Sequence, residues 1–298
     1  MALAPIFTHS RCLDHRAGLH HPEAPARLRA VLDRVQAVDP GALREAAPAS
    51  LEAIRRVHPD AYLDRLAAVA AAGGGKLDPD TAMNAWSWEA ALGATGAALA
   101  ALDSALDGVP AFAAIRPPGH HALLEASMGF CLLGNAVIAA REAQARGRAR
   151  VLIVDWDVHH GNGTQALVER DPTIRFVSMH QWPHWPFSGA ADERGVGNVF
   201  NVPMRAALAP EEYVEALWHA VGAATADFQP DLIVVSAGFD SMAGDLLGGF
   251  TLEPEHYVAW VDRLRTRFPG VPLVALMEGG YVPARLADGV VAVAAALR

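Results

Sequence analysis

The chain has 298 residues, 52% of them hydrophobic and 19% charged, so it can bury a large core and is not globally disordered. The formal net charge is −9, and no Lys- or Arg-rich run indicates nucleic-acid binding. Two cysteines, Cys12 and Cys131, are too few for a disulfide scaffold or a Cys-based zinc cluster. No apolar run reaches the ~18 residues that span a bilayer, and the first residues lack a signal-peptide pattern, so we expect a cytoplasmic protein.

Helical and strand patterns alternate along the chain. Leu28, Val31, Leu32 and Val35 share one helical face. Similar patterns predict helices over residues 61–72, 89–106, 135–146, 211–226, 253–268 and 283–297. Apolar runs without strict alternation predict buried parallel strands over residues 111–115, 151–154, 174–177, 232–235 and 271–276. The pattern predicts a single α/β domain over residues 1–298, with an open, mainly parallel sheet and helices on both faces.

Polar sequences punctuated by glycine or proline follow the predicted strands. They are Arg116–His121, Asp155–Gly163, Ser178–His180, Ser236–Asp240 and Met277–Tyr281. Ligands of open α/β sheets bind beyond the carboxyl ends of the strands, so we expect these sequences to meet in one cleft. Incidental polar residues in turns would explain one such sequence, but they explain five together poorly.

Asp157, His159 and Asp240 are the candidate metal ligands. Asp157 and His159 alternate along an extended segment, so both side chains can face the same side. Asp240 follows another strand and could complete three protein ligands, which leaves a position open for water or substrate. Two carboxylates and an imidazole suit Zn²⁺, and Fe²⁺ or Co²⁺ are compatible with the same ligands.

His120, His121 and Tyr281 are the candidate acid–base and electrophilic groups. Adjacent histidines beside a metal can divide proton acceptance and donation, and Asp155 could orient one of them. Tyr281 follows Gly279-Gly280, a turn that lets its phenol reach a cleft and stabilise an oxyanion. Simple packing is the alternative interpretation of this tyrosine.

Together these residues resemble the zinc-dependent histone deacetylase superfamily, which includes acetylpolyamine amidohydrolases and bacterial deacetylase-like amidohydrolases. The resemblance runs from His20-His21-Pro22-Glu23 to Glu278-Gly279-Gly280-Tyr281 and includes Met128-Gly129-Phe130-Cys131. It implies an arginase-like fold and hydrolysis of an acyl-amide, typically N-acetyl-lysine. It assigns Asp157, His159 and Asp240 to zinc, His120 and His121 to proton transfer, and Tyr281 to the transition state.

The resemblance also implies a substrate tunnel and a second ion. Gly129, Phe130 and Trp185 would line the tunnel, although Trp185 could instead be a packing residue. A structural K⁺ would be held by Asp155, Ser178 and the backbone carbonyls of Asp157, His159 and Met179. Either Asp78 or Asp80 would hold the substrate backbone.

Three positions separate this chain from particular relatives. Asn162 stands where class I members usually carry Asp, so His121 would pair with a neutral amide. Arginase-like enzymes need two further carboxylate ligands, and here those positions are Gly161 and Met242, which cannot ligate a second metal. A binding module that had lost catalysis would lack a ligand, a histidine or the tyrosine, and none is missing.

Leu247 bears on the substrate. It lies seven residues after Asp240, near the expected tunnel mouth, where acetylpolyamine enzymes of the family tend to carry an acidic residue. We therefore expect acyl-lysine in proteins or peptides as the substrate, with an acetylated polyamine or other small acetylated amine as the alternative. The sequence predicts no oligomeric state.

Overall fold

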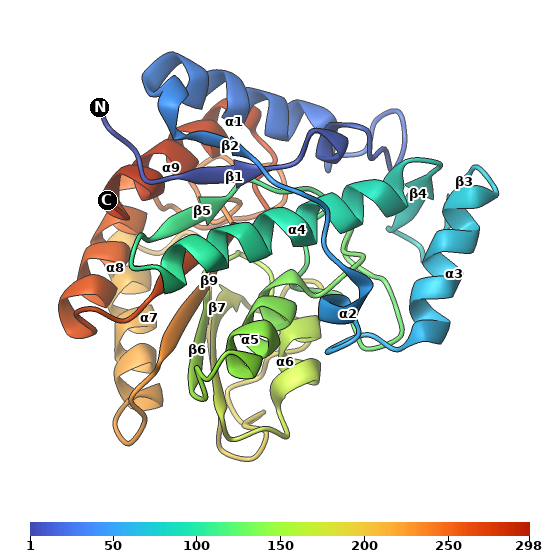
Figure 1. The fold of residues 1–298 in the computed structure, drawn as a ribbon. Coiled ribbons are helices and arrows are strands. Elements are labelled where there is room, and N and C mark those ends of the chain that lie inside the picture. The colour runs from blue at the N-terminus through green and yellow to red at the C-terminus, as the bar shows by residue number, and fades with distance from the viewer.

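The centre of the molecule is an eight-stranded sheet in the order β2-β1-β5-β10-β9-β6-β7-β8, and every neighbouring pair is parallel (Figure 1). The structure is a computed structural model that describes residues 1–298. The strands are β1 (Ile6–Thr8), β2 (Leu43–Glu45), β5 (Ala111–Ala113), β6 (Val151–Asp155), β7 (Ile174–Gln181), β8 (Val199–Met204), β9 (Leu232–Ala237) and β10 (Leu273–Met277). A separate antiparallel hairpin joins β3 (Gly74–Lys76) to β4 (Ala82–Asn84).

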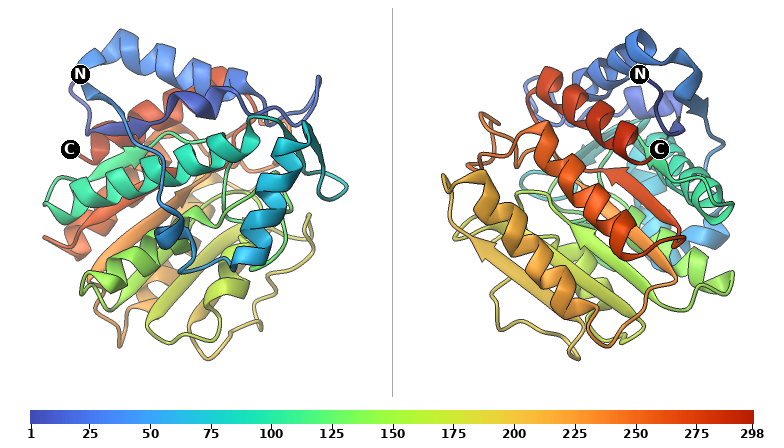
Figure 2. Two further views of the ribbon diagram at one scale, coloured as in Figure 1. Left: turned by 45° about the vertical axis from the view of Figure 1, so that its right-hand side comes forward. Right: turned by 90° about the vertical axis from the view of Figure 1, so that its left-hand side faces the viewer.

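Helices cover both faces of the sheet (Figure 2). One layer contains α1 (Pro25–Val38), α7 (Pro210–Ala224), α8 (Pro254–Arg267) and α9 (Pro283–Ala296), in which α9 packs on both α1 and α8. The other contains α4 (Ser87–Leu106), α5 (Asn135–Ala145) and α6 (Asn162–Val168). The remaining helices are α2 (Leu51–Ile54), α3 (Asp60–Ala71), and the 3₁₀ helices η1 (Ser10–Leu13) and η2 (Pro40–Ala42).

Burial on both faces explains the composition of the central strands. All residues of β6 and β9 are buried, and one continuous hydrophobic core joins the sheet to both helical layers. Small residues let α4 approach its neighbours closely. A Cβ at Gly96 would lie 2.0 Å from the carbonyl oxygen of Ala47, so glycine is required there.

The predicted fold class is confirmed, and all predicted helices and strands occur within a few residues of their expected bounds. The strand predicted over 111–115 was too long, because the pairing of β5 with both β1 and β10 ends at Ala113. The strand predicted over 174–177 was too short, because β8 pairs with β7 as far as Gln181. The sequence patterns missed β1, β2, β8 and the β3–β4 hairpin, most of which are only three residues long.

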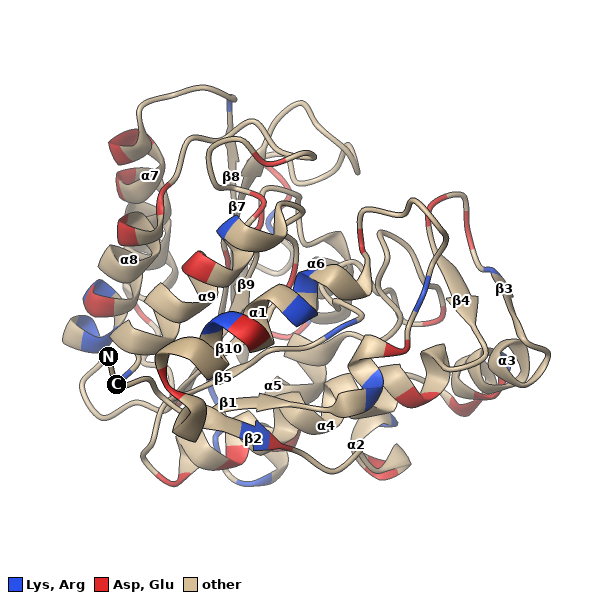
Figure 3. Ribbon diagram, turned by 90° about the horizontal axis from the view of Figure 1, so that it is seen from above, with Lys and Arg blue, Asp and Glu red and all other residues tan.

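Charged residues occur on helices and on loops alike (Figure 3). Figure 3 shows Asp and Glu along α7, which carries Glu211, Glu212 and Glu215. None of the helices combines the length and the apolar character that a membrane span would need.

Candidate active site

Four of the five expected polar sequences follow β5, β6, β9 and β10 and meet at one edge of the sheet, because all strands run in the same direction. The fifth, Ser178–His180, lies within β7 and not after it. They contribute to a pocket of about 210 Å³. Its lining residues are Asp80, His121, Gly129, Phe130, His159, His184, Trp185, Leu247 and Tyr281. We call this cavity the active-site pocket. Most of these lining residues were singled out in the sequence, and His184 was not.

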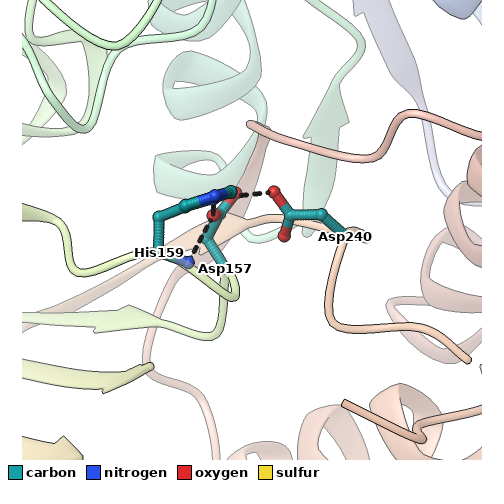
Figure 4. A group of neighbouring side chains, drawn as sticks. All are labelled: Asp157, His159 and Asp240. Carbon is teal, nitrogen blue, oxygen red and sulfur yellow. Dashed lines mark hydrogen bonds and ion pairs between the residues drawn. The ribbon is translucent and has the colours of Figure 1, made fainter. Parts of the chain in front are cut away.

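Asp157, His159 and Asp240 form a buried cluster beside this pocket (Figure 4). Their potential ligand atoms all lie within 4.8 Å of one another. The Nδ1 atom of His159 lies 3.1 Å from Oδ1 of Asp157 and 3.2 Å from Oδ2 of Asp240. The three side chains thus present one nitrogen and two oxygen atoms to a common point.

Backbone contacts orient both carboxylates of this cluster. Oδ2 of Asp157 accepts the N–H of Gly279 at 2.8 Å, and Oδ1 of Asp240 accepts the N–H of Val158 at 2.9 Å. The other oxygen of each carboxylate is therefore turned toward His159. Glycine at position 279 permits this approach, because a Cβ there would lie 2.0 Å from Oδ2 of Asp240.

The charge of the cluster suits a divalent cation. Burial, together with the negative charge of Asp157, raises the pKa of Asp240 to about 7. Two carboxylates so close together in a buried site repel each other unless a cation neutralises them. An Asp–His–Asp set with one side open to the pocket fits a catalytic divalent metal such as Zn²⁺.

The two adjacent histidines have different partners. His120 Nδ1 lies 3.0 Å from Oδ2 of Asp155, and His121 Nδ1 lies 2.7 Å from Oδ1 of Asn162. Because carboxylate and amide oxygens only accept hydrogen bonds, Nδ1 carries the proton in both rings. The Nε2 atom of neutral His121 is therefore unprotonated, and the imidazole ring lines the active-site pocket.

The same surroundings separate the pKa values of these histidines. Burial, reinforced by the positive charges of His120 and His159, places the pKa of His121 well below its ordinary value. Burial also opposes the charged form of His120, but the carboxylates of Asp157 and Asp155 outweigh it and raise the pKa of His120 well above its ordinary value. His121 is thus suited to accept a proton, and His120 to remain charged.

Residues 278–281 form backbone hydrogen bonds with several other segments of the site. Gly279 binds Asp157, the carbonyl of Gly280 accepts the Nε–H of Arg27 at 2.6 Å, and the N–H of Tyr281 donates to Asp245 at 2.7 Å. Tyr281 is 7% exposed, and burial raises the pKa of its phenol well above the usual range. The hydroxyl therefore keeps its proton at neutral pH and can donate a hydrogen bond.

Gly129, Phe130 and Trp185 form walls of the active-site pocket. The ring of Trp185 meets His121 edge-on, with centroids 4.7 Å apart. Gly129 has φ +57°, and a Cβ there would lie 2.3 Å from the His121 ring and 2.6 Å from Trp185. Trp185 is therefore a pocket wall rather than a core residue, and Leu247 also lines the pocket.

The structure distinguishes the two aspartates that the sequence left open. Oδ1 of Asp80 accepts the N–H of Gly129 at 3.0 Å, and Asp80 lines the active-site pocket. Asp78 instead accepts the N–H groups of Asp80 and Thr81, which closes its own turn. Asp80 is therefore the one positioned to meet a substrate.

The residues expected at a monovalent-cation site lie next to the metal cluster. Asp155 and Ser178 are paired in register on β6 and β7, and Met179 follows on β7. All three are buried, as are Asp157 and His159. A buried carboxylate and hydroxyl side by side are compatible with a bound cation, and the K⁺ site stays a prediction.

The sequence patterns indicated no role for His184, Glu278 and Arg27. The His184 ring stacks on that of His159 at 5.1 Å, and its Nε2–H donates to the carbonyl of Leu247 at 2.9 Å. Oε2 of buried Glu278 accepts the N–H groups of Gly119 and His120 at 2.7 and 3.2 Å. His184 directly precedes Trp185, and Glu278 begins the sequence Glu278–Tyr281. This proximity to residues already singled out was the only signal in the sequence.

Comparisons with known proteins agree with this geometry. The Histone deacetylase domain family matches residues 21–297. A Histone deacetylase-like amidohydrolase of Pseudomonas aeruginosa is 41% identical, over 93% of this chain and 81% of that protein. Polyamine deacetylase HDAC10 of Homo sapiens is 35% identical, over 90% of this chain and 43% of that protein. The crystal structure of the HDA15 HD domain is 33% identical, with a TM-score of 0.93 over 98% of this chain and 90% of that one.

The fold and the buried Asp–His–Asp group define a metal-dependent amidohydrolase. With the family match over residues 21–297, the chain belongs to the histone deacetylase domain family. It is a deacetylase-type amidohydrolase, and its substrates are acetylated compounds.

Proposed function

We propose that this protein removes acetyl or other acyl groups from lysine side chains in proteins or peptides. The observation that carries the substrate class is the apolar side chain of Leu247 in the active-site pocket. A polyamine carries further ammonium groups beyond its acetylated end, and a carboxylate at the mouth would attract them. Leu247 offers no such attraction, whereas it can contact the apolar stem of a lysine side chain.

Asp157, His159 and Asp240 would hold the catalytic metal, with Zn²⁺ favoured and Fe²⁺ or Co²⁺ compatible with the same ligands. When bound, Zn²⁺ would supply a Lewis acid that polarises the acyl carbonyl and acidifies a water molecule. K⁺ held by Asp155, Ser178 and the carbonyls of Asp157, His159 and Met179 would stabilise the loop that carries the ligands.

Both proton transfers are assigned to His121, and His120 supplies a fixed positive charge. His121 accepts a proton from the attacking water at Nε2, because its Nδ1–H is held by Asn162. It then returns this proton to the leaving amine nitrogen as the amide C–N bond breaks. His120, held by Asp155, keeps its positive charge and stabilises the negative charge that develops on the substrate.

Tyr281 completes the site by donating a hydrogen bond from its phenol to the carbonyl oxygen as that oxygen gains negative charge. Phe130 and Trp185 confine the lysine stem between apolar walls. Asp80 retains an oxygen, Oδ2, that can accept N–H groups of the peptide backbone.

The test is a deacylation screen of the metal-loaded protein against acetyl-lysine peptides and acetylated polyamines, with Asp240→Ala as the inactive control. We expect kcat/KM to favour the peptides. Leu247→Glu should move the ratio roughly fivefold toward polyamines, because one carboxylate near an ammonium contributes about 1 kcal/mol in a solvated site. Leu247→Gln, of similar size and uncharged, should not. A wild-type preference for polyamines would contradict the peptide assignment and leave the chemistry intact.

The second candidate is deacetylation of polyamines or other small acetylated amines. It is favoured by the 35% identity to Polyamine deacetylase HDAC10. The same screen decides between the two, because both substrate classes are measured on one preparation.

A further inference from the structure

Three strongly exposed apolar side chains lie next to the pocket walls. Apart from Met1, the most exposed large hydrophobic residues of the molecule are Leu19, Phe187 and Leu246, at 98%, 72% and 70%. We call these three residues the apolar rim. Clusters of exposed apolar residues are unusual in soluble folds and commonly mark contact sites.

Contacts between loops place the segments that carry the apolar rim beside the walls of the active-site pocket. Leu246 directly precedes Leu247, and Phe187 lies two residues after Trp185. The bond from His184 to the carbonyl of Leu247 joins these two loops. Leu19 lies on a third loop.

The loop of Leu19 is anchored to another wall of the same pocket. The ring of His21 meets that of Phe130 edge-on at 4.5 Å, and its Nε2 lies 3.2 Å from the carbonyl oxygen of Asp80. Phe130 and Asp80 both line the pocket. The segments that carry the apolar rim are therefore joined to more than one wall of the pocket.

The backbone at Phe187 is strained, although its side chain gains little from packing. Its φ is +62°, in the left-handed region that costs a non-glycine residue about 1–2 kcal/mol. The N–H of Phe187 is fixed by the carbonyl of His184 at 2.8 Å, yet the aromatic ring is directed into solvent. A strained backbone that holds an aromatic ring exposed to solvent is typical of a position that contacts a ligand.

Apart from Asp80 and Asp245, the segments around the mouth carry few charged side chains. Residues 17–22, 126–133, 181–191 and 246–252 contain no Lys, Arg, Asp or Glu, in a chain with a net charge of −9. Asp80 is the one carboxylate that lines the pocket, and its Oδ1 is engaged by Gly129. Exposed apolar side chains on these segments complement apolar groups of a substrate.

We infer that the apolar rim binds apolar side chains on either side of the acyl-lysine, so that the enzyme selects acyl-lysines in apolar peptide segments. The inference rests on the proposed function and adds a sequence preference to it. The apolar rim can bury part of a Leu or Phe side chain of the peptide. That residue must lie close to the modified lysine in the peptide sequence to reach the rim. Partial burial of one such side chain should raise kcat/KM roughly tenfold.

The test uses two acetyl-lysine peptides of equal length and net charge, one with Leu at the positions flanking the lysine and one with Ser. We expect the Leu peptide to have a kcat/KM at least tenfold higher, expressed mainly in KM. Phe187→Ser and Leu246→Ser should each lower this ratio several-fold, and the double variant should bring it close to one. Val109→Ser is the matched control, because Val109 is 48% exposed and precedes β5 at the amino end of the sheet.

The possible outcomes separate the two proposals. If neither peptide is deacetylated by the metal-loaded protein, the proposed function fails. If both are deacetylated equally well, the function stands and the inference about the apolar rim is wrong. A second copy of the chain could also cover the apolar rim, and analytical ultracentrifugation of the wild type and the double variant tests this. A dimeric wild type together with a monomeric double variant would assign the rim to a second copy and overturn the inference.

Discussion

Glu23 should contribute strongly to stability, and its contribution should disappear in acid. This buried carboxylate lies between two buried guanidinium groups. Arg116 binds it through two hydrogen bonds, at 2.6 Å to Oε1 and 2.7 Å to Oε2, and Nη1 of Arg27 lies 2.9 Å from Oε1. Arg27 also binds the carbonyl of Gly280, so this ion cluster supports the turn that carries Tyr281.

The magnitude follows from the pKa of Glu23. Burial by itself would raise this pKa, but Arg116 and Arg27 outweigh it and lower the pKa from its ordinary 4.5 to about 2. Each pKa unit corresponds to about 1.36 kcal/mol, so the ionised form contributes about 3 kcal/mol. Because folding lowers the pKa, this contribution is complete above pH 4.5 and is lost as the pH falls toward 2. His15, 3.5 Å from Glu23, stays neutral above pH ~4 because burial lowers its pKa to about 4.

The perturbation is Glu23→Gln, which leaves both guanidinium groups buried without a counter-charge. Removing one partner of a buried ion pair costs about 3–5 kcal/mol. Urea unfolding followed by tryptophan fluorescence should show a loss of this size at pH 7. The difference between wild type and variant should shrink steadily below pH 4.5. Glu52→Gln is the control, because the side chain of Glu52 is 83% exposed and its loss should change stability by less than about 0.5 kcal/mol.

Two results would refute this reasoning. One is a variant as stable as the wild type at pH 7, which would mean that the ion cluster contributes nothing net. The other is a difference in stability that stays constant from pH 7 to pH 3, which would show that the loss comes from altered packing and not from the charge of Glu23.

Three further predictions concern the chemistry. Asp240→Ala should abolish both metal content, measured by elemental analysis, and activity, while circular dichroism shows the fold retained; full metal occupancy in the variant would remove Asp240 from the ligand set. Tyr281→Phe should lower kcat by ~10²–10³, about 2.7–4 kcal/mol, with KM little changed; a change confined to KM would make Tyr281 a binding residue alone. Asn162→Asp places a carboxylate beside His121, which raises the pKa of that histidine and should shift the acidic limb of the kcat/KM–pH profile upward; an unchanged profile would limit Asn162 to a structural role.

The sequence by itself determined the fold class and most of the chemistry. The buried apolar runs of β6 and β9 do not alternate with polar residues, which indicates a parallel sheet with helices on both faces. In such a sheet all carboxyl ends lie along one edge, so polar residues distant in sequence must meet there. The sequence alone therefore predicts that Asp157, His159 and Asp240 lie close together.

The tertiary structure decided what depends on the packing of loops. Asp78 and Asp80 look equivalent in the sequence, and only the turn geometry shows that Asp80 reaches the pocket. His184 enters the pocket wall because the carbonyl of Leu247, 63 residues away, accepts its Nε2–H. Short strands such as β1 and β2 carry too few residues for a periodic signal and form only because neighbouring strands supply hydrogen-bond partners. Local sequence patterns report local conformation and burial, whereas contacts between distant loops arise only when the folded core fixes where each loop begins and ends.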